Sequence, residues 1–186
     1  MKKHVIYIAF LLAHFLVSCQ QKNDQKEVQT ASKDLIQPLI KEGNVLLNSG
    51  QYDKAVKVFQ DAVKIDSLNI DALYGIGVAQ AIICNTNEEQ CQEAVSNLSK
   101  VIRQDSKYRN SLYNRGTCYF VLGDLQKALN DLNSAVKLNP KDADYYYNRG
   151  LIHAELSDFK NACGDFRKSQ KLGLEDAKEM IQSYCN

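Results

Sequence analysis

A chain of 186 residues, 45% of them hydrophobic, is long enough and apolar enough to form one folded domain. Its 23 basic and 22 acidic side chains nearly cancel. Nucleic-acid-binding proteins carry a clustered basic excess that this sequence lacks, so nucleic acid is not expected as a partner.

The first 18 residues are typical of a secretory signal peptide. A short basic start with Lys2 and Lys3 precedes an apolar run over residues 5–17, which ends at the small Ser18. A helix of 13 residues spans roughly 20 Å, whereas the hydrocarbon core of a bilayer is about 30 Å thick. We therefore expect residues 1–18 to be removed, not to span the membrane. Their removal leaves 21 basic and 22 acidic side chains.

The sequence Leu16-Val17-Ser18-Cys19 resembles a bacterial lipobox. In that family the cysteine thiol receives a diacylglyceryl group and becomes the first residue after cleavage. The resemblance implies lipidation of Cys19 and a place in the bacterial cell envelope, with the periplasmic face of the outer membrane favoured over the cell surface. An ordinary signal peptide that happens to carry a cysteine is the alternative. Residues 19–34 would then be the lipidated cysteine and a flexible, polar linker.

Three series of residues recur through the rest of the chain with a common period. One series is spaced by 34, 39 and 34 residues, and the other two by 39, 34 and 34, so all share one insertion of five residues. The three series are Gly43, Gly77, Gly116 and Gly150; Ala55, Ala94, Ala128 and Ala162; and Phe59, Leu98, Leu132 and Phe166. The pattern indicates an internal repeat.

The period and the residue types resemble the tetratricopeptide repeat, a helix–turn–helix unit of 34 residues. Repeat three carries the signature residues Leu112, Gly116, Tyr119, Gly123, Ala128, Leu132, Ala135 and Pro140. The resemblance implies an all-α fold, a right-handed superhelical α-solenoid, over residues 35–186. We expect about four repeats, at 36–69, 70–108, 109–142 and 143–176. An amphipathic capping helix within 174–186 would cover the last repeat.

The residues that could carry chemistry are few. His153 is the one histidine beyond the signal peptide, and no nucleophile or acid is placed near it by the pattern, so we interpret it as a packing residue. Metal-ligand spacings are absent from the sequence. We therefore expect no enzyme activity, no cofactor, no metal and no small-molecule substrate.

A secreted chain meets an oxidising compartment, where disulfides can form. Cys84 and Cys91 flank the five-residue insertion, and Cys163 and Cys185 could join the last repeat to the capping helix. That all of them stay reduced is the alternative. Cys118 is expected to be a small buried hydrophobe.

In proteins that resemble this one, the first helices of the repeats line a concave groove. The residues expected there are Tyr74, Tyr113 and Tyr147 at one repeat position, Asn114 and Asn148 at the next, and Asn44 and Thr117 one turn further on. Tyrosine and asparagine suit an extended peptide or a partner's helix, although tyrosines that only pack between helices are the alternative. Where some relatives use basic groups to hold a C-terminal carboxylate, this chain has tyrosine.

Two arginine–aspartate pairs also recur, Arg115 with Asp131 and Arg149 with Asp165. We interpret them as ion pairs that lock the two helices of a repeat, in preference to ligand contacts. The sequence thus predicts a lipid-anchored adaptor that binds a protein or an extended peptide. The alternative function is a structural or regulatory subunit of an envelope enzyme complex, such as a cell-wall hydrolase or a secretion machine.

Overall fold

The computed structural model describes residues 33–84, 87–108 and 110–185, and every regular element in these ranges is a helix. The first covers residues 33–48, so Lys33 and Asp34, expected in the linker, are already helical. It is followed by α2 (Tyr52–Ile65), α3 (Ile70–Ile83), α4 (Glu88–Gln104), α5 (Ser111–Val121), α6 (Leu125–Leu138), α7 (Ala143–Glu155), α8 (Phe159–Lys171) and α9 (Ala177–Tyr184). The expected signal peptide and Cys19 lie outside the described residues.

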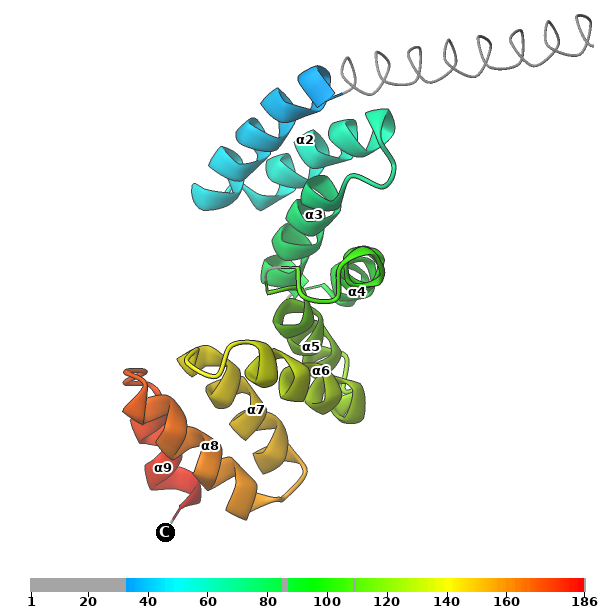
Figure 1. Cartoon of the computed structure of the whole chain (residues 1–186). Coiled ribbons are helices and arrows are strands. Elements are labelled where there is room, and N and C mark those ends of the chain that lie inside the picture. The colour runs from blue at the N-terminus through cyan, green and yellow to red at the C-terminus, as the bar shows by residue number, and fades with distance from the viewer. Residues whose placement is uncertain (1–32, 85–86, 109, 186) are drawn as a thin grey trace, which may run out of the picture.

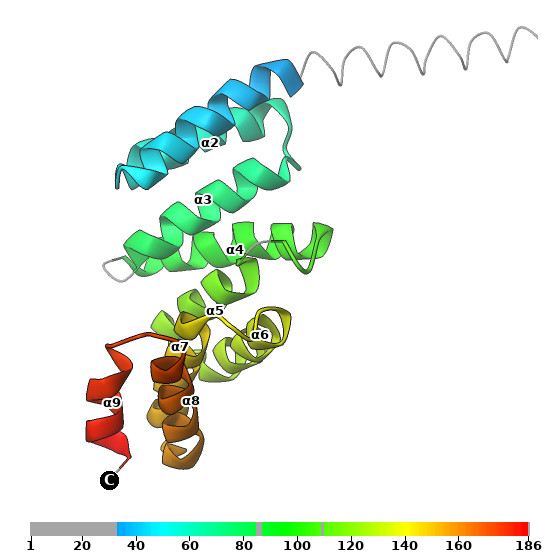
Figure 2. The ribbon, with the colours of Figure 1, turned by 60° about the vertical axis from the view of Figure 1, so that its left-hand side comes forward.

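The helices form antiparallel pairs that stack along the molecule, from the helix 33–48 at one end to α9 at the other (Figures 1 and 2). The pairs are 33–48 with α2, α3 with α4, α5 with α6, and α7 with α8, while α9 packs on α8. The first helices α3, α5 and α7 also contact one another in sequence. The α-solenoid expected from the repeat pattern is therefore confirmed. Within the described ranges, no helix has the length and apolarity needed to cross a membrane.

Each recurrent glycine lies where a phenylalanine or leucine side chain from a second helix fills the space between helices. The Phe59 ring lies between the helix 33–48 and α3, and a Cβ added at Gly43 or Gly75 would come within 2.5 Å of it. Phe166 occupies the same place against Gly150, at 2.7 Å. Both phenylalanines are fully buried, and each buried ring stabilises the stack by about 1.5–3 kcal/mol.

Three of the turns between paired helices contain one left-handed residue. Gly50 and Gly123 have a φ of 75° there, and Ser157 takes a φ of 58° at the equivalent turn of the fourth pair. After the turn, Asp124 and Asp158 accept hydrogen bonds from backbone N–H groups that open α6 and α8, as N-cap residues do.

Each recurrent arginine links three helices. Arg149 on α7 donates through Nε and Nη2 to both carboxylate oxygens of Asp165 on α8, at 2.8 and 2.7 Å, and through Nη1 to Asn133 on α6, at 2.9 Å. Arg115 repeats this arrangement with Asp131 on α6 and with Ser99 on α4. The predicted pairs therefore lock the two helices of one repeat and also join them to the repeat before.

Two disulfides close the structure at the pairings that the sequence suggested. Cys84 at the end of α3 is bonded to Cys91, with their Cα atoms 4.7 Å apart, and Cys163 on α8 is bonded to Cys185 after α9, at 5.5 Å. Cys91 lies inside α4, so part of the five-residue insertion is helical. Cys118 has a free thiol and is 1% exposed.

Candidate protein-binding groove

A cavity of about 370 Å³ opens on the side of the molecule formed by the first helices. Four of the predicted groove residues line it, and they come from α5 and α7: Tyr113, Asn114, Thr117 and Asn148. Ala81 and Ile82 of α3 and Phe120 and Val121 of α5 complete the wall. None of these lining residues is charged, so the cavity suits an uncharged side chain and polar backbone groups. We call this cavity and its two ends along α5 the groove.

A tyrosine of one repeat is hydrogen-bonded to an asparagine of the next, and this step occurs twice. Asn114 donates from Nδ2 to the hydroxyl of Tyr74 at 3.5 Å, and Asn148 donates to the hydroxyl of Tyr113 at 3.1 Å. The amide of Asn148 also donates to the carbonyl oxygen of Asp144 at 3.0 Å. Because a carbonyl only accepts, this second bond fixes which end of the amide is nitrogen. Among the described residues, nothing donates to the remaining Oδ1 of Asn148, so that atom can accept from a ligand.

Tyr113 is a partly buried tyrosine whose neighbours keep its hydroxyl group protonated. Its ring stacks on Tyr145 with centroids 4.9 Å apart. The pKa of Tyr113 is raised to about 12, first by burial and then by the negative charges of Asp144 and Asp142, while the hydrogen bond from Asn148 acts in the opposite direction. The tyrosine therefore stays neutral at physiological pH and can donate as well as accept.

Three predicted groove residues do not line the cavity. Tyr74 packs edge-on against Tyr108, with ring centroids 5.4 Å apart, and its hydroxyl accepts the hydrogen bond from Asn114, which does line the cavity. Tyr147 packs against Phe166 at 6.0 Å, and its pKa is raised by burial and by the charges of Asp176 and Glu179 near the capping helix. Asn44 is half-buried on the helix 33–48, which contributes nothing to the cavity wall.

Sequence reasoning missed the apolar end of the groove. Ile82 and Val121 are exposed by 46% and 44%, and they share a repeat position, since they are separated by the same 39 residues as the glycines of their repeats. Ala81 and Phe120 share the preceding position. All four residues could have been found by extending the comparison of equivalent repeat positions to the end of each first helix.

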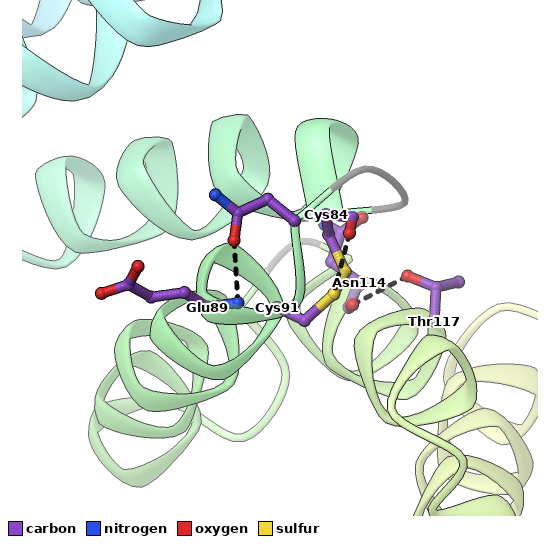
Figure 3. The surroundings of a disulfide bond; sticks show 6 residues. Cys84, Glu89, Cys91, Asn114 and Thr117 are labelled. Carbon is purple, nitrogen blue, oxygen red and sulfur yellow. Dashed lines mark hydrogen bonds between the residues drawn. A yellow bond between two sulfur atoms is a disulfide. The ribbon is translucent and has the colours of Figure 1, made fainter.

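The Cys84–Cys91 disulfide lies next to the groove residues Asn114 and Thr117 (Figure 3). Both sulfurs are buried in one cluster with Cys118 of α5, and Ala81 packs against that cluster. Asn114 and Thr117 both belong to α5, and the hydroxyl of Thr117 donates to the carbonyl oxygen of Asn114 at 2.8 Å (Figure 3). The disulfide therefore ties the end of α3, which carries Ala81 and Ile82, to α4.

His153 does not line the groove. Its Nδ1 lies 3.5 Å from Asp158 and its Nε2 lies 4.0 Å from Asp165, with the side chain 14% exposed. The expected packing position thus also places the imidazole between two carboxylates, which the sequence pattern did not indicate. In the described part of the chain, no group of three or more His, Cys, Asp or Glu side chains could hold a metal ion.

Comparisons with known proteins agree with the fold. A TPR repeat model matches residues 43–81 and 117–157, and two further tetratricopeptide repeat models match residues 87–136 and 143–172. No curated protein matches the sequence significantly.

Solved structures of other proteins are similar over most of the chain. MamA (residues 41 to the end) from Desulfovibrio magneticus RS-1 is 27% identical, with a TM-score of 0.67 over 74% of this chain and 75% of that one. TTC0263, a thermophilic TPR protein of Thermus thermophilus, is 23% identical, with a TM-score of 0.63 over 74% of both chains. The first TPR of Spaghetti (RPAP3), solved with the HSP90 peptide SRMEEVD, is 20% identical, with a TM-score of 0.60 over 66% of this chain and 93% of that one.

Proposed function

Because the chain belongs to the tetratricopeptide repeat family, we propose that it is a protein-binding scaffold held at the bacterial envelope by a lipid on Cys19. The groove binds a protein partner or an extended peptide, and the lipid brings that partner to the membrane. The observation that carries the proposal is the uncharged cavity bounded by Tyr113, Asn114, Thr117 and Asn148.

The chemistry of this wall supports binding over catalysis. Tyrosine offers a large rigid surface at low entropic cost, and asparagine offers adaptable hydrogen bonds, as in other peptide-binding surfaces. The hydroxyl of Thr117 already donates to a backbone carbonyl, and no histidine or carboxylate among the lining residues could act on it as a base. That a related repeat domain was solved with a bound peptide adds support for a peptide ligand.

The groove is tested by a matched pair of arginine substitutions. Tagged wild-type protein, Thr117→Arg and Gln126→Arg are purified from membranes of the native host, and co-purifying proteins are quantified by mass spectrometry. Thr117→Arg fills the cavity with a charged side chain, whereas Gln126 is exposed on α6. We expect one or a few proteins to be lost with Thr117→Arg and kept with Gln126→Arg. Equal recovery with both variants would contradict binding at the groove.

The identity of the lost protein separates the two functions. An outer-membrane protein outside any enzyme complex would fit the adaptor, and a component of a cell-wall hydrolase complex or a secretion machine would fit the structural or regulatory subunit.

The lipid anchor is tested separately. Cells fed labelled palmitate should label the wild-type protein but not Cys19→Ala, which should leave the membrane fraction. Label on both proteins would contradict lipidation at Cys19. Several acyl chains are needed for stable anchoring, so the mass of the mature N-terminal peptide is the direct measurement.

A further inference from the structure

The two ends of the groove differ in chemistry. Tyr113 lies at one end of the cavity wall and Val121 at the other, eight residues apart on α5. At 1.5 Å per helical residue they are about 12 Å apart along the helix axis, which an extended chain spans in about four residues.

The end at Tyr113 is negative. Asp142 and Asp144 lie at the start of α7, and Asp144 is one turn before Asn148, whose amide bonds both the carbonyl oxygen of Asp144 and the hydroxyl of Tyr113. The charges of both aspartates also raise the pKa of Tyr113. The pKa of Asp142 is itself raised, first by burial and then by the like charge of Asp144. Of the described residues, no Lys, Arg or His has a side-chain nitrogen within 4.0 Å of either carboxylate. Lys107 lines the adjoining cavity of about 200 Å³ but forms no ion pair with either aspartate. Among the residues that the structure describes, the two carboxylates thus have no cationic partner, and Asp142 accepts hydrogen bonds only from uncharged donors, which include Asn139 and the backbone N–H of Asp144.

The end at Val121 is apolar. Ile82 and Val121 are nearly half exposed, and Phe120 lies beside them in the cavity wall. Phe120 and Val121 also line a second cavity, of about 420 Å³, in which Glu155 is the one charged lining residue. An exposed apolar surface next to a groove is typical of a site that a partner covers.

We infer that the groove takes an extended segment with a lysine or arginine beside Asp142 and Asp144 and a bulky apolar side chain about four residues away, between Ile82 and Val121. The inference rests on the proposed function and names the class of partner. Between the two ends, Oδ1 of Asn148 accepts from a backbone N–H of the segment. A segment with carboxylates, such as the peptide SRMEEVD in the related structure, would face like charge and a surplus of acceptors.

The test is a selection followed by titration. A phage-displayed library of random 12-residue peptides is selected on the full chain in detergent micelles. Selected sequences are then synthesised with blocked ends and titrated by calorimetry. We expect Lys or Arg to be enriched three to five positions from Leu, Ile, Phe or Met.

Matched variants assign the basic residue to its place. In the double variant Asp142→Asn and Asp144→Asn, we expect selected peptides to bind about fivefold more weakly at low salt, a difference that salt reduces. Asparagine at 142 keeps the N-cap of α7, and the control Asp61→Asn removes an exposed carboxylate on α2.

The possible outcomes distinguish this inference from the scaffold function. Enrichment of Asp or Glu, or basic peptides that bind the double variant as tightly as the wild type, would overturn the inference and leave the scaffold function standing, provided that Thr117→Arg abolishes binding. If no selected peptide is sensitive to Thr117→Arg, both are contradicted.

Discussion

Removing the carboxylate of Asp165 should destabilise the stack far more than removing an exposed one. Arg149 makes two hydrogen bonds to Asp165 and one to Asn133, and the two side chains of the ion pair are only 19% and 10% exposed. Breaking a fully buried ion pair from one side costs about 3–5 kcal/mol, because the remaining charge stays buried without a partner. This pair retains some contact with water, so we expect Asp165→Ala to lower the free energy of unfolding by about 2–3 kcal/mol.

The exposed pair of Lys64 and Asp61 on α2 provides the control. Their side chains are 75% and 56% exposed, and such surface pairs contribute about 0–1 kcal/mol. Asp61→Ala should therefore change the stability by less than about 0.5 kcal/mol. Both variants are measured in the full chain by urea denaturation, with the disulfides oxidised and helix content followed by circular dichroism.

A double-mutant cycle with Arg149→Ala and Asp165→Ala tests the pairing itself. If the two side chains stabilise the fold through each other, the double variant loses less than the sum of the single losses, by about 2 kcal/mol. Additive losses, or an Asp165→Ala variant as stable as Asp61→Ala, would refute the structural role. The recurrent arginines would then become candidates for ligand contacts.

Three further predictions concern packing and ionisation. Gly150→Ala should destabilise by about 2 kcal/mol, because its Cβ would meet Phe166 at 2.7 Å, whereas Gly164→Ala, with nothing within 4 Å, should stabilise α8 by about 0.5–1 kcal/mol; urea melts measure both. Cys118 should resist iodoacetamide until the protein unfolds, since burial raises its pKa to about 12, and intact-mass spectrometry detects the adduct. The pKa of Tyr145 is raised to about 12, mainly by burial, whereas a tyrosine in the unfolded chain ionises near 10. The melting temperature should therefore fall between pH 10 and 12, and it should fall less in Tyr145→Phe.

The fold could be predicted because its packing depends on residue size at fixed positions. Gly43 and Gly150 are required where the rings of Phe59 and Phe166 approach within 3 Å of an added Cβ, so the same sizes recur at the same spacing. Gly123 could be predicted for a related reason: the turn needs a residue with a φ of 75°, which glycine adopts without steric cost.

The site could be predicted only in part, because repeat equivalence fails where the neighbours differ. Tyr113 and Tyr147 share a repeat position, but Tyr113 faces the first helix of another repeat, whereas Tyr147 lies against Phe166 beside the single capping helix. Asn44 belongs to the helix 33–48, which lies beyond the cavity. The negative pair of Asp142 and Asp144 is visible in the sequence, but its effect on Tyr113 depends on how the two repeats stack.

Photo-crosslinking in living cells tests the central claim, that the groove is the surface that binds a partner. Benzoylphenylalanine is placed at Phe120, where one aromatic side chain replaces another in the cavity wall, and at exposed Lys127 on α6 as the control. We expect a discrete adduct with one protein from Phe120 and none from Lys127. An adduct from Lys127 alone, or no adduct from either position, would contradict it.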